Sequence, residues 1–551
     1  MLATFLVLAV TAVAYLPSLD NGFTNWDDPL YVTANEAVRR LSPHSAAGFF
    51  TSFTAGNYHP LTLLSLAVNQ RLFGGAAASF HTVNLALHLA NTLLVFLIAT
   101  LLSRPVAGSS SPGSRTVAPF VAALLFGVHP LHVESVAWIA ERKDVLSTFF
   151  FLAAWLSYLR HHPLKLGWSW YWLSVVLLAL SLLSKSMGVS FPLVIFLSDR
   201  LFRRSVDRRM LLEKVPFLAL SLGFGAVALI AQRSGEAIRL SADFPLWKTP
   251  FIAGYGLVFY LVKLVVPLGL SAFYPLPGTP GAALPPVLPA ALLLALALAA
   301  AVLSLGRHRE RLRFGVLFFL VSILPVLQIV PIGQAVTADR YTYLPSFGLF
   351  WLAGEGFARL LQRLSGPRRG GWTRAAAAWA GLALAVVCLA QLTWRRTQVW
   401  RDGVTLWENV ITSYPDSALA RKNLGIARHE RSDAAGAVED LTVALRQTPF
   451  DPDVYRSRGS AYVDLGQSDL ALADFDRAVG LKPDHAEALN NRGALLAARG
   501  ALLRALSDFD RAIAVNPRYA MALLNRARAR EALGDLAGAG EDRARVRSLE
   551  R

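Results

Sequence analysis

Long apolar runs fill the first 394 residues of this 551-residue chain, and they constrain its fold more than any other feature. Eleven runs have roughly 17 to 23 residues, which is the length that a helix needs to cross a bilayer. The runs lie near residues 1–19, 81–102, 117–134, 144–160, 168–184, 187–202, 214–231, 286–305, 313–331, 344–362 and 375–394. We therefore predict an all-α polytopic membrane domain over residues 1–394. The first run lacks the basic start and the small-residue cleavage site of a signal peptide, so we expect a retained span.

The loops between these runs differ in charge, and this difference predicts their orientation. One alternate set of loops, which includes 199–214, 306–313 and 359–374, carries 19 Lys and Arg residues. The opposite set carries 11 over a much greater length, including the long first loop at 20–80. Basic loops stay in the cytoplasm, so the N-terminus is predicted inside and the first loop outside. Segment 250–270 is apolar but carries Gly, Lys and Pro, and we assign it to the membrane surface as an interfacial helix.

Composition narrows the class of protein further. Only 17% of the residues are charged, where soluble chains average about a quarter. The net charge of +17 lies mostly in short loops, so membrane topology explains it and we predict no nucleic-acid binding. The single cysteine, Cys388, excludes an intramolecular disulfide and a Cys-based zinc site.

After residue 394 the pattern changes to a repeat of 34 residues. Prolines recur with this period, and so do small residues in two predicted helices. These positions are Pro415, Pro449, Pro483 and Pro517, then Gly425, Gly459 and Gly493, then Ala437, Ala471 and Ala505, and finally Ala444, Ala478 and Ala512. The period is that of tetratricopeptide repeats (TPRs), which stack into an α-solenoid. We predict a linker and half repeat over 395–414, and three full repeats with a degenerate capping repeat over 415–551.

Two adjacent carboxylates follow the first predicted span. Asp27 and Asp28 lie in Asn21-Gly22-Phe23-Thr24-Asn25-Trp26-Asp27-Asp28-Pro29. Paired carboxylates can bind a cation or supply a general base. The alternative is a solvated turn, because Asn, Gly, Asp and Pro are ordinary turn residues.

Ionisable residues also gather at a second outward boundary. The chain has His129, His132 and Glu134 in one short segment, followed by Glu141-Arg142-Lys143-Asp144. Charges at a membrane boundary are costly and usually functional. The two histidines and Glu134 could ligate a metal, but the intervening proline interrupts helical geometry, so we favour hydrogen-bonded packing and assign no metal site.

Three cations are predicted on the same outward side. Arg142, Lys185 and Arg340 would surround a cavity edged by Asp27 and Asp28. Such an arrangement suits a lipid that carries phosphate. The alternative is that each cation is a snorkelling anchor at the membrane surface.

In this order, the motifs resemble those of the transmembrane and tetratricopeptide-repeat (TMTC-type) protein O-mannosyltransferases, a branch of the GT-C membrane glycosyltransferases. The resemblance is nearly full length and ends in the TPRs. It is carried by Trp26-Asp27-Asp28, Tyr58-His59-Pro60-Leu61-Thr62, His129-Pro130-Leu131-His132-Val133-Glu134-Ser135-Val136, Leu183-Ser184-Lys185 and Asp339-Arg340-Tyr341-Thr342-Tyr343-Leu344-Pro345-Ser346.

The resemblance implies transfer of a mannose-like sugar from a polyprenyl or dolichyl phosphate to Ser or Thr hydroxyls of proteins outside the cytoplasm. Asp27 or Asp28 would be the catalytic carboxylate, and Arg142, Lys185 and Arg340 would bind the donor phosphate. Supporting roles fall to other motif residues, namely His59, His129, His132, Glu134, Asp144 and Tyr341. Acceptor proteins would bind the TPRs, and a divalent metal remains possible as a cofactor.

Two departures from the family pattern touch the predicted phosphate site. The family tends to have a Gly-Arg-Ala-Glu-like segment at 141–144, and an acidic residue where this chain has Ser186. The Ala- and Arg-rich composition and the small number of repeats predict a bacterial inner-membrane protein with its first loop and TPRs in the periplasm. A eukaryotic chain would lie in the endoplasmic reticulum membrane.

Two other classes of protein are alternatives to the enzyme. A non-catalytic membrane anchor for a TPR scaffold would bind other proteins, but it needs one span and has no use for Asp27 and Asp28 beside cations. A transporter would also have many spans, but the sequence shows no inverted repeat and no paired broken helices.

Overall fold

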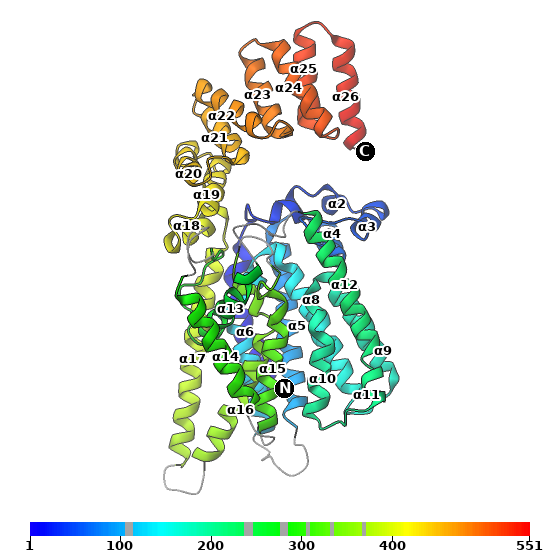
Figure 1. Cartoon of the computed structure of the whole chain (residues 1–551), viewed down its shortest axis with the longest axis vertical. Coiled ribbons are helices and arrows are strands. Elements are labelled where there is room, and N and C mark those ends of the chain that lie inside the picture. Colours follow the sequence, from blue (N-terminus) through cyan, green and yellow to red (C-terminus); the bar gives the residue numbers. More distant parts are fainter. Residues whose placement is uncertain are drawn as a thin grey trace. The chain divides into compact units, whose positions relative to one another are not determined.

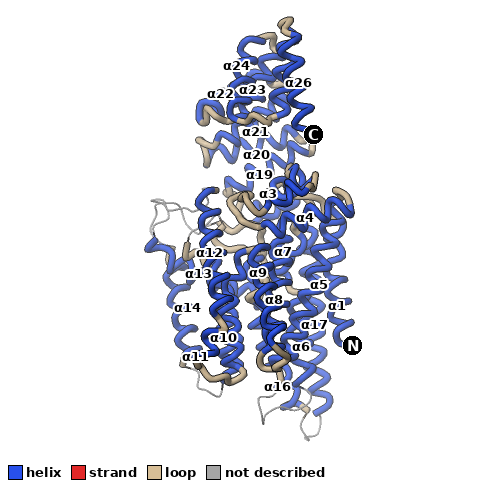
Figure 2. Tube along the Cα trace, turned by 90° about the vertical axis from the view of Figure 1, so that its right-hand side faces the viewer, coloured by secondary structure: helices blue, strands red, loops and turns tan. Residues whose placement is uncertain are grey.

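The computed structural model describes residues 1–104, 114–235, 246–275, 285–304, 309–330, 335–365 and 371–550. Nearly all of the ordered structure in these ranges is helical (Figures 1 and 2). The extended structure there consists of two isolated bridges, Thr54 with Asn57 and Tyr274 with Thr337. The chain divides into two compact units, Met1–Leu406 and Trp407–Arg551. This all-α architecture confirms the predicted fold class.

The first unit is a bundle of helices joined by short turns. Its α-helices are α1 (Leu2–Tyr15), α2 (Glu36–Arg39), α3 (Pro43–Phe49), α4 (Pro60–Phe73), α5 (Ala77–Leu102), α6 (Ser114–Val128), α7 (Val133–Ala137), α8 (Arg142–His161), α9 (Trp168–Ser184), α10 (Phe191–Leu201), α11 (Arg208–Leu212), α12 (Val215–Ser234), α13 (Thr249–Val265), α14 (Val287–Leu303), α15 (Glu310–Ile323), α16 (Ser346–Leu364) and α17 (Gly371–Val399). Short 3₁₀ or π turns are η1 (Leu16–Asp20), η2 (Pro29–Thr33), η3 (Pro130–His132), η4 (Ile139–Glu141), η5 (Ser186–Ser190), η6 (Leu246–Lys248), η8 (Leu324–Val326) and η9 (Asp339–Thr342).

Among the described residues, four helical segments are long and apolar enough to cross a membrane. They are Leu2–Asp20, Ala77–Leu102, Arg208–Ser234 and Gly371–Val399. The spans predicted at 168–184 and 286–305 correspond to the shorter apolar helices α9 and α14, and α13, in the segment assigned to the membrane surface, is a shorter apolar helix as well. The chain is therefore built as a membrane protein, whereas the count of eleven spans stays a prediction. The assignment of α13 to the membrane surface likewise stays a prediction.

The run predicted as a span at 117–134 is not one continuous helix. The helix ends at Val128, and the chain resumes at Pro130 with a bend of 52°. Proline has no backbone N–H and cannot continue the hydrogen-bonding pattern of the preceding helix. The break sets His129 and His132 in a turn within the bundle rather than on one helical face.

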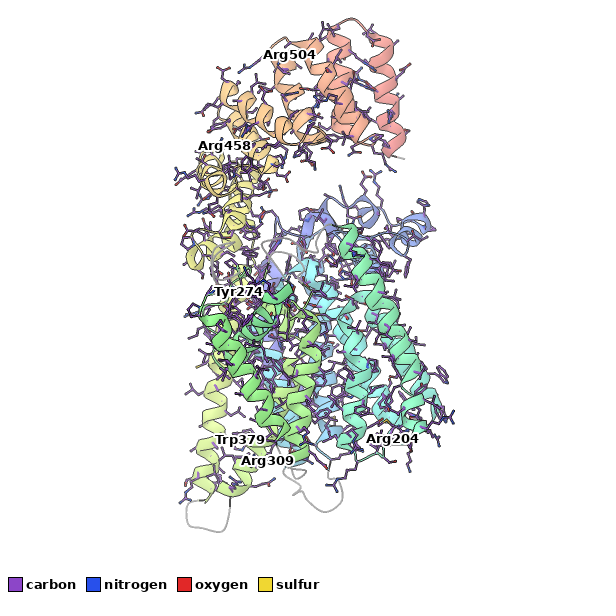
Figure 3. The ribbon with its side chains drawn as sticks, viewed as in Figure 1. Arg204, Tyr274, Arg309, Trp379, Arg458 and Arg504 are labelled. Atoms are coloured by element: carbon purple, nitrogen blue, oxygen red, sulfur yellow. The ribbon has the colours of Figure 1, made fainter. Side chains whose placement is uncertain are left out.

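The first loop and several basic residues lie at opposite ends of the first unit. Helices α2 and α3 lie at one end of the bundle, and Arg204 and Arg309 are labelled at the opposite end (Figure 3). This placement agrees with the alternation of loops on which the predicted orientation depends. Several basic loops, including 103–116 and the part of 306–313 that holds Arg307, lie wholly or partly outside the described residues.

The second unit is a stack of antiparallel helix pairs. Its helices are α18 (Gly403–Ser413), which begins in the first unit, and then α19 (Ala418–Glu430), α20 (Ala434–Gln447), α21 (Pro452–Asp464), α22 (Ser468–Leu481), α23 (Ala486–Ala498), α24 (Leu502–Val515), α25 (Ala520–Ala532) and α26 (Leu536–Glu550). The predicted end of the membrane domain at residue 394 falls inside α17, which continues to Val399.

Close packing within each repeat explains the small residues. A Cβ atom added at Gly459 would lie 2.7 Å from the ring of Phe475, and one at Gly493 would lie 2.7 Å from the ring of Phe509. Such distances are too short for carbon atoms, so a side chain at either position would force the helices apart. The repeated alanines are fully buried in the same layers.

Candidate active site

The first loop of the chain is held against the bundle by the buried carboxylate of Asp28. Its Oδ2 atom accepts hydrogen bonds from the backbone N–H of Thr24 at 2.8 Å and from the Thr24 hydroxyl at 3.0 Å. Its Oδ1 atom accepts one from the backbone N–H of Ala140 at 2.9 Å. Burial raises the pKa of Asp28 to about 6, and these hydrogen bonds oppose that shift. Asp28 thus fixes the loop on the turn that precedes α8.

Asp27 is the accessible member of the predicted pair. Its side chain is 27% exposed, and its Oδ2 atom lies 3.3 Å from the ammonium nitrogen of Lys143. A carboxylate that accepts a proton from a substrate must be reachable by that substrate. Asp27 meets this requirement and Asp28, which is 1% exposed, does not.

Glu141 is the centre of a buried group of charged side chains. Its carboxylate lies 3.2 Å from Lys143 Nζ, 3.2 Å from Lys185 Nζ and 3.3 Å from Arg340 Nε. Lys185 also lies 2.5 Å from Asp144, and Arg340 pairs with Glu134. We call this group the charged cluster. Its members are Asp27, Glu134, Glu141, Lys143, Asp144, Lys185 and Arg340.

The charged cluster is fixed by further hydrogen bonds. The Ser135 hydroxyl donates to Asp144 Oδ2 at 3.1 Å, and the backbone N–H of Arg340 donates to Glu134 Oε2 at 3.0 Å. Four carboxylates therefore surround three cations. Each cation has at least one carboxylate partner within the charged cluster.

Aromatic rings border the charged cluster. Trp138 stacks on Trp26 of the first loop with ring centroids 4.8 Å apart. Lys143 Nζ lies 4.6 Å from the centroid of the Tyr31 ring, and the Arg340 guanidinium lies 5.0 Å from that of Tyr341. Cations over aromatic faces are electrostatically favourable. These rings fix the positions of Lys143 and Arg340.

Arg142 lies apart from the charged cluster. Its guanidinium donates to the side-chain oxygens of Asn69, at 3.0 Å, and Asn84, and to the Phe80 carbonyl at 2.9 Å. The expected trio of Arg142, Lys185 and Arg340 is therefore not brought together. Lys143, one residue later, occupies the place that the sequence assigned to Arg142.

The predicted supporting histidines are packed in the interior. His129 Nε2 lies 3.2 Å from the Leu264 carbonyl, and His132 Nε2 lies 3.0 Å from the Ser346 hydroxyl. His59 Nδ1 lies 3.4 Å from the Tyr31 hydroxyl, and burial lowers the pKa of His59. No group of three metal-ligating side chains occurs among the described residues.

A small cavity touches the cationic side of the charged cluster. Its volume is about 10 Å³, and Asp144, Lys185 and Arg340 line it together with Met187 and Leu344. This is the room of about one water molecule.

Some site residues were not identified from the sequence. Glu141 and Lys143 belong to the charged segment at 141–144, but no role was predicted for either. The structure also places Asn84, His88 and Asn91 on one face of α5, where His88 and Asn91 contact the Tyr343 hydroxyl at 2.7 and 3.1 Å. Their spacing of four and three residues within an apolar helix is a signal that could have identified them.

Fold and site together define a helical membrane protein with a buried charged cluster, followed by TPRs. The tetratricopeptide repeat family model matches residues 389–452, 456–511 and 502–546. The repeats predicted from the sequence are thereby confirmed.

Curated relatives match most of the chain. It is 26% identical over 80% of its length to Protein O-mannosyl-transferase Tmtc1 of Drosophila melanogaster, of which it covers 60%. It is 24% identical over 87% of its length to Protein O-mannosyl-transferase TMTC3 of Mus musculus, of which it covers 54%. The chain thus spans somewhat more than half of these relatives. The resemblance to TMTC-type proteins is confirmed.

A solved structure with a similar fold covers about a quarter of the chain. The crystal structure of MamA covers 27% of this chain at 19% identity, with a TM-score of 0.25. A structural match with so low a TM-score says nothing about the membrane unit or its charged cluster.

Proposed function

We propose that this chain is a membrane glycosyltransferase that transfers a mannose-like sugar from a polyprenyl-phosphate donor to Ser or Thr hydroxyls of proteins outside the cytoplasm. The observation that carries the proposal is the accessible carboxylate of Asp27 at the rim of the charged cluster. Similarity to proteins named protein O-mannosyl-transferases over about four fifths of the chain supports it.

Asp27 is the proposed general base. Its carboxylate would take the proton of the acceptor hydroxyl as the hydroxyl oxygen forms a bond to the anomeric carbon of the sugar. The bond from that carbon to the phosphate oxygen breaks, and the polyprenyl phosphate leaves with the electron pair. A single displacement of this kind inverts the anomeric configuration. Lys143, whose Nζ lies 3.3 Å from Asp27 Oδ2, would hold the carboxylate in position for this step.

Lys185 and Arg340 are the proposed partners of the donor phosphate. Both line the small cavity next to Asp144. The leaving phosphate gains negative charge, and cations in a site that excludes water stabilise such a change strongly. The phosphate oxygens would replace some of the carboxylate oxygens that now contact Lys185 and Arg340. In this mechanism Asp28 is a positioning residue, since it holds the loop that carries Asp27.

The TPR stack is the proposed binding surface for the acceptor protein, because stacked repeats present extended concave surfaces to peptides and helices. The proposed location is a membrane in which the first loop and the repeats face away from the cytoplasm. The excess of Lys and Arg in the opposite loops supports this orientation.

The proposal is tested by transfer from a polyprenyl-phosphate mannose donor to protein Ser and Thr residues, measured by mass spectrometry. Asp27→Asn should lower transfer by about 100-fold or more, since a general base typically contributes that much. The matched control is Asp402→Asn, whose carboxylate belongs to the same unit but lies outside the charged cluster. Full transfer by Asp27→Asn, with normal insertion, would overturn the assignment of the base. A chain that ends at Ser413 should lose transfer to its native acceptor while it retains hydrolysis of the donor.

A further inference from the structure

A buried guanidinium without a carboxylate partner lies outside the charged cluster. Arg142 is 0% exposed, and its hydrogen-bond partners are neutral oxygens. These partners are Asn84 Oδ1, Asn69 Oδ1 at 3.0 Å, the Phe80 carbonyl at 2.9 Å and Ser65 Oγ at 3.3 Å. Among the described residues, no carboxylate forms an ion pair with Arg142. Its charge is hydrogen-bonded but not neutralised.

The contrast with the neighbouring cations is direct. Lys143, Lys185 and Arg340 each pair with at least one carboxylate of the charged cluster. A buried charge without a counter-charge is unfavourable, so such a group gains most from an anionic ligand. The Nη1 atom of Arg142 has one long contact, to Ser65 Oγ at 3.3 Å, and both residues line a groove, so an anion that displaces the Ser65 hydroxyl would reach Nη1.

Arg142 lines an apolar groove whose other lining residues belong to α4, α5 and α8. The groove has a volume of about 330 Å³, within the range of lipid-sized and ligand-sized pockets. Its walls include Leu64, Val68 and Phe150, and its polar lining is confined to Arg142, Asn69 and Ser65. Such a site combines room for a hydrocarbon chain with one positive charge.

The outer surface beside the groove is apolar as well. On α4, Leu72 is 67% exposed beside the groove, and Phe73, which lines the groove, is 62% exposed. In a helix that faces lipid, such exposure is favourable, whereas in water it would be costly. The groove therefore borders a surface suited to the bilayer.

We propose that this groove binds one anionic phospholipid of the surrounding bilayer, with its phosphodiester on Arg142 and an acyl chain along α4 and α8. The single charge of the phosphodiester matches the single unneutralised guanidinium. No residue of the charged cluster lines the groove, so a lipid bound there would not contact Asp27. This separation favours a bilayer lipid over the sugar donor, and the site does not depend on the proposed enzymatic function.

The test is lipid retention by the full-length chain, purified in mild detergent and analysed by native mass spectrometry. Phosphatidylglycerol and phosphatidylcholine are supplied in equal amounts. We expect the wild type to retain one phosphatidylglycerol. Arg142→Gln should lower that occupancy about tenfold or more, because a hydrogen bond to a charged group is lost.

A second pair of variants keeps the guanidinium and changes only the groove. Leu64→Trp should fill the groove and displace the lipid, whereas Leu72→Trp, on the same helix outside the groove, should retain it. Equal occupancy in the wild type, Arg142→Gln and Leu64→Trp would overturn the proposal, as would equal retention of phosphatidylcholine. Stronger binding of polyprenyl phosphate than of phosphatidylglycerol would also overturn it, and would assign the groove to the sugar donor.

Discussion

The two units each contain a network of buried ion pairs, and the two networks are built differently. In the TPRs, Arg458, Arg492 and Arg526 pair with aspartates sixteen residues later. These aspartates, Asp474, Asp508 and Asp542, recur every 34 residues, and Asp440 precedes them in the first repeat. In the membrane unit, the charged cluster joins residues from the first loop, from α7, η4 and the first turn of α8, and from the turns before α10 and α16.

This difference indicates that the Arg–Asp pairs of the repeats serve the architecture, whereas the charged cluster is a candidate site. Each bidentate Arg–Asp pair of the repeats is satisfied within its own helix pair and recurs because the repeat recurs. The charged cluster has no periodicity, draws on distant segments and includes one accessible carboxylate. Charges held in such an arrangement mark functional sites more often than repeated ones do.

The largest expected effect is the loss of the central carboxylate of the charged cluster. Glu141→Gln leaves three buried cations without their shared partner, which should destabilise the first unit by about 3–5 kcal/mol. The measurement is the thermal inactivation of the purified full-length chain. Glu310→Gln is the matched control, because its pair with Arg203 is exposed and should contribute little. Equal inactivation of the two variants would contradict a central role for Glu141.

A smaller effect is expected for the Arg–Asp pairs that recur in the repeats, which we call the Arg–Asp ladder. Arg492→Met leaves the buried carboxylate of Asp508 without its bidentate partner, which should cost about 1–3 kcal/mol. Urea denaturation followed by circular dichroism measures it, and Arg499→Met, whose partner Asp469 is 94% exposed, is the control. The same variant should leave sugar transfer unchanged. If transfer fell as far as it does in Asp27→Asn, the division between architectural and functional networks would be wrong.

The smallest effect concerns an exposed pair between repeats. The hydrogen bond from His485, 3.0 Å away, lowers the pKa of Asp453. A lowered carboxyl pKa stabilises the fold above the usual range of aspartate, near 4, and this contribution is lost as the pH falls below that range. Because Asp453 is 51% exposed, Asp453→Asn should cost less than about 1 kcal/mol at pH 7. The difference from the wild type should shrink progressively as the pH falls below about 4, and a constant difference would contradict this origin.

The repeats were almost fully predictable from the sequence. A period of 34 residues fixes which positions meet, so the positions of Gly459 and Gly493 in the repeat already predicted close helix contacts, which the structure contains. The Arg–Asp ladder was equally present in the sequence at the same period, although it was not recognised there. Local periodicity carries this information because each repeat contacts mainly its neighbours.

The candidate site was predictable only in part. The sequence identified Asp27, Lys185 and Arg340, which the structure brings into one cluster. It did not predict that Arg142 and Lys143, which are adjacent, would extend to different surroundings. Those directions depend on Asn69, Asn84 and Glu141, and the first two come from helices far away in the sequence.

By itself, the sequence determined that the chain has a helical membrane unit and a TPR stack, because hydrophobic length and a 34-residue period are properties of local segments. Tertiary structure decided that Asp28 holds the first loop while Asp27 stays accessible, and that Arg142 borders an apolar groove instead of the charged cluster. The physical reason is that burial and the pairing of charges depend on which distant segments pack together. No local pattern of residues encodes that choice.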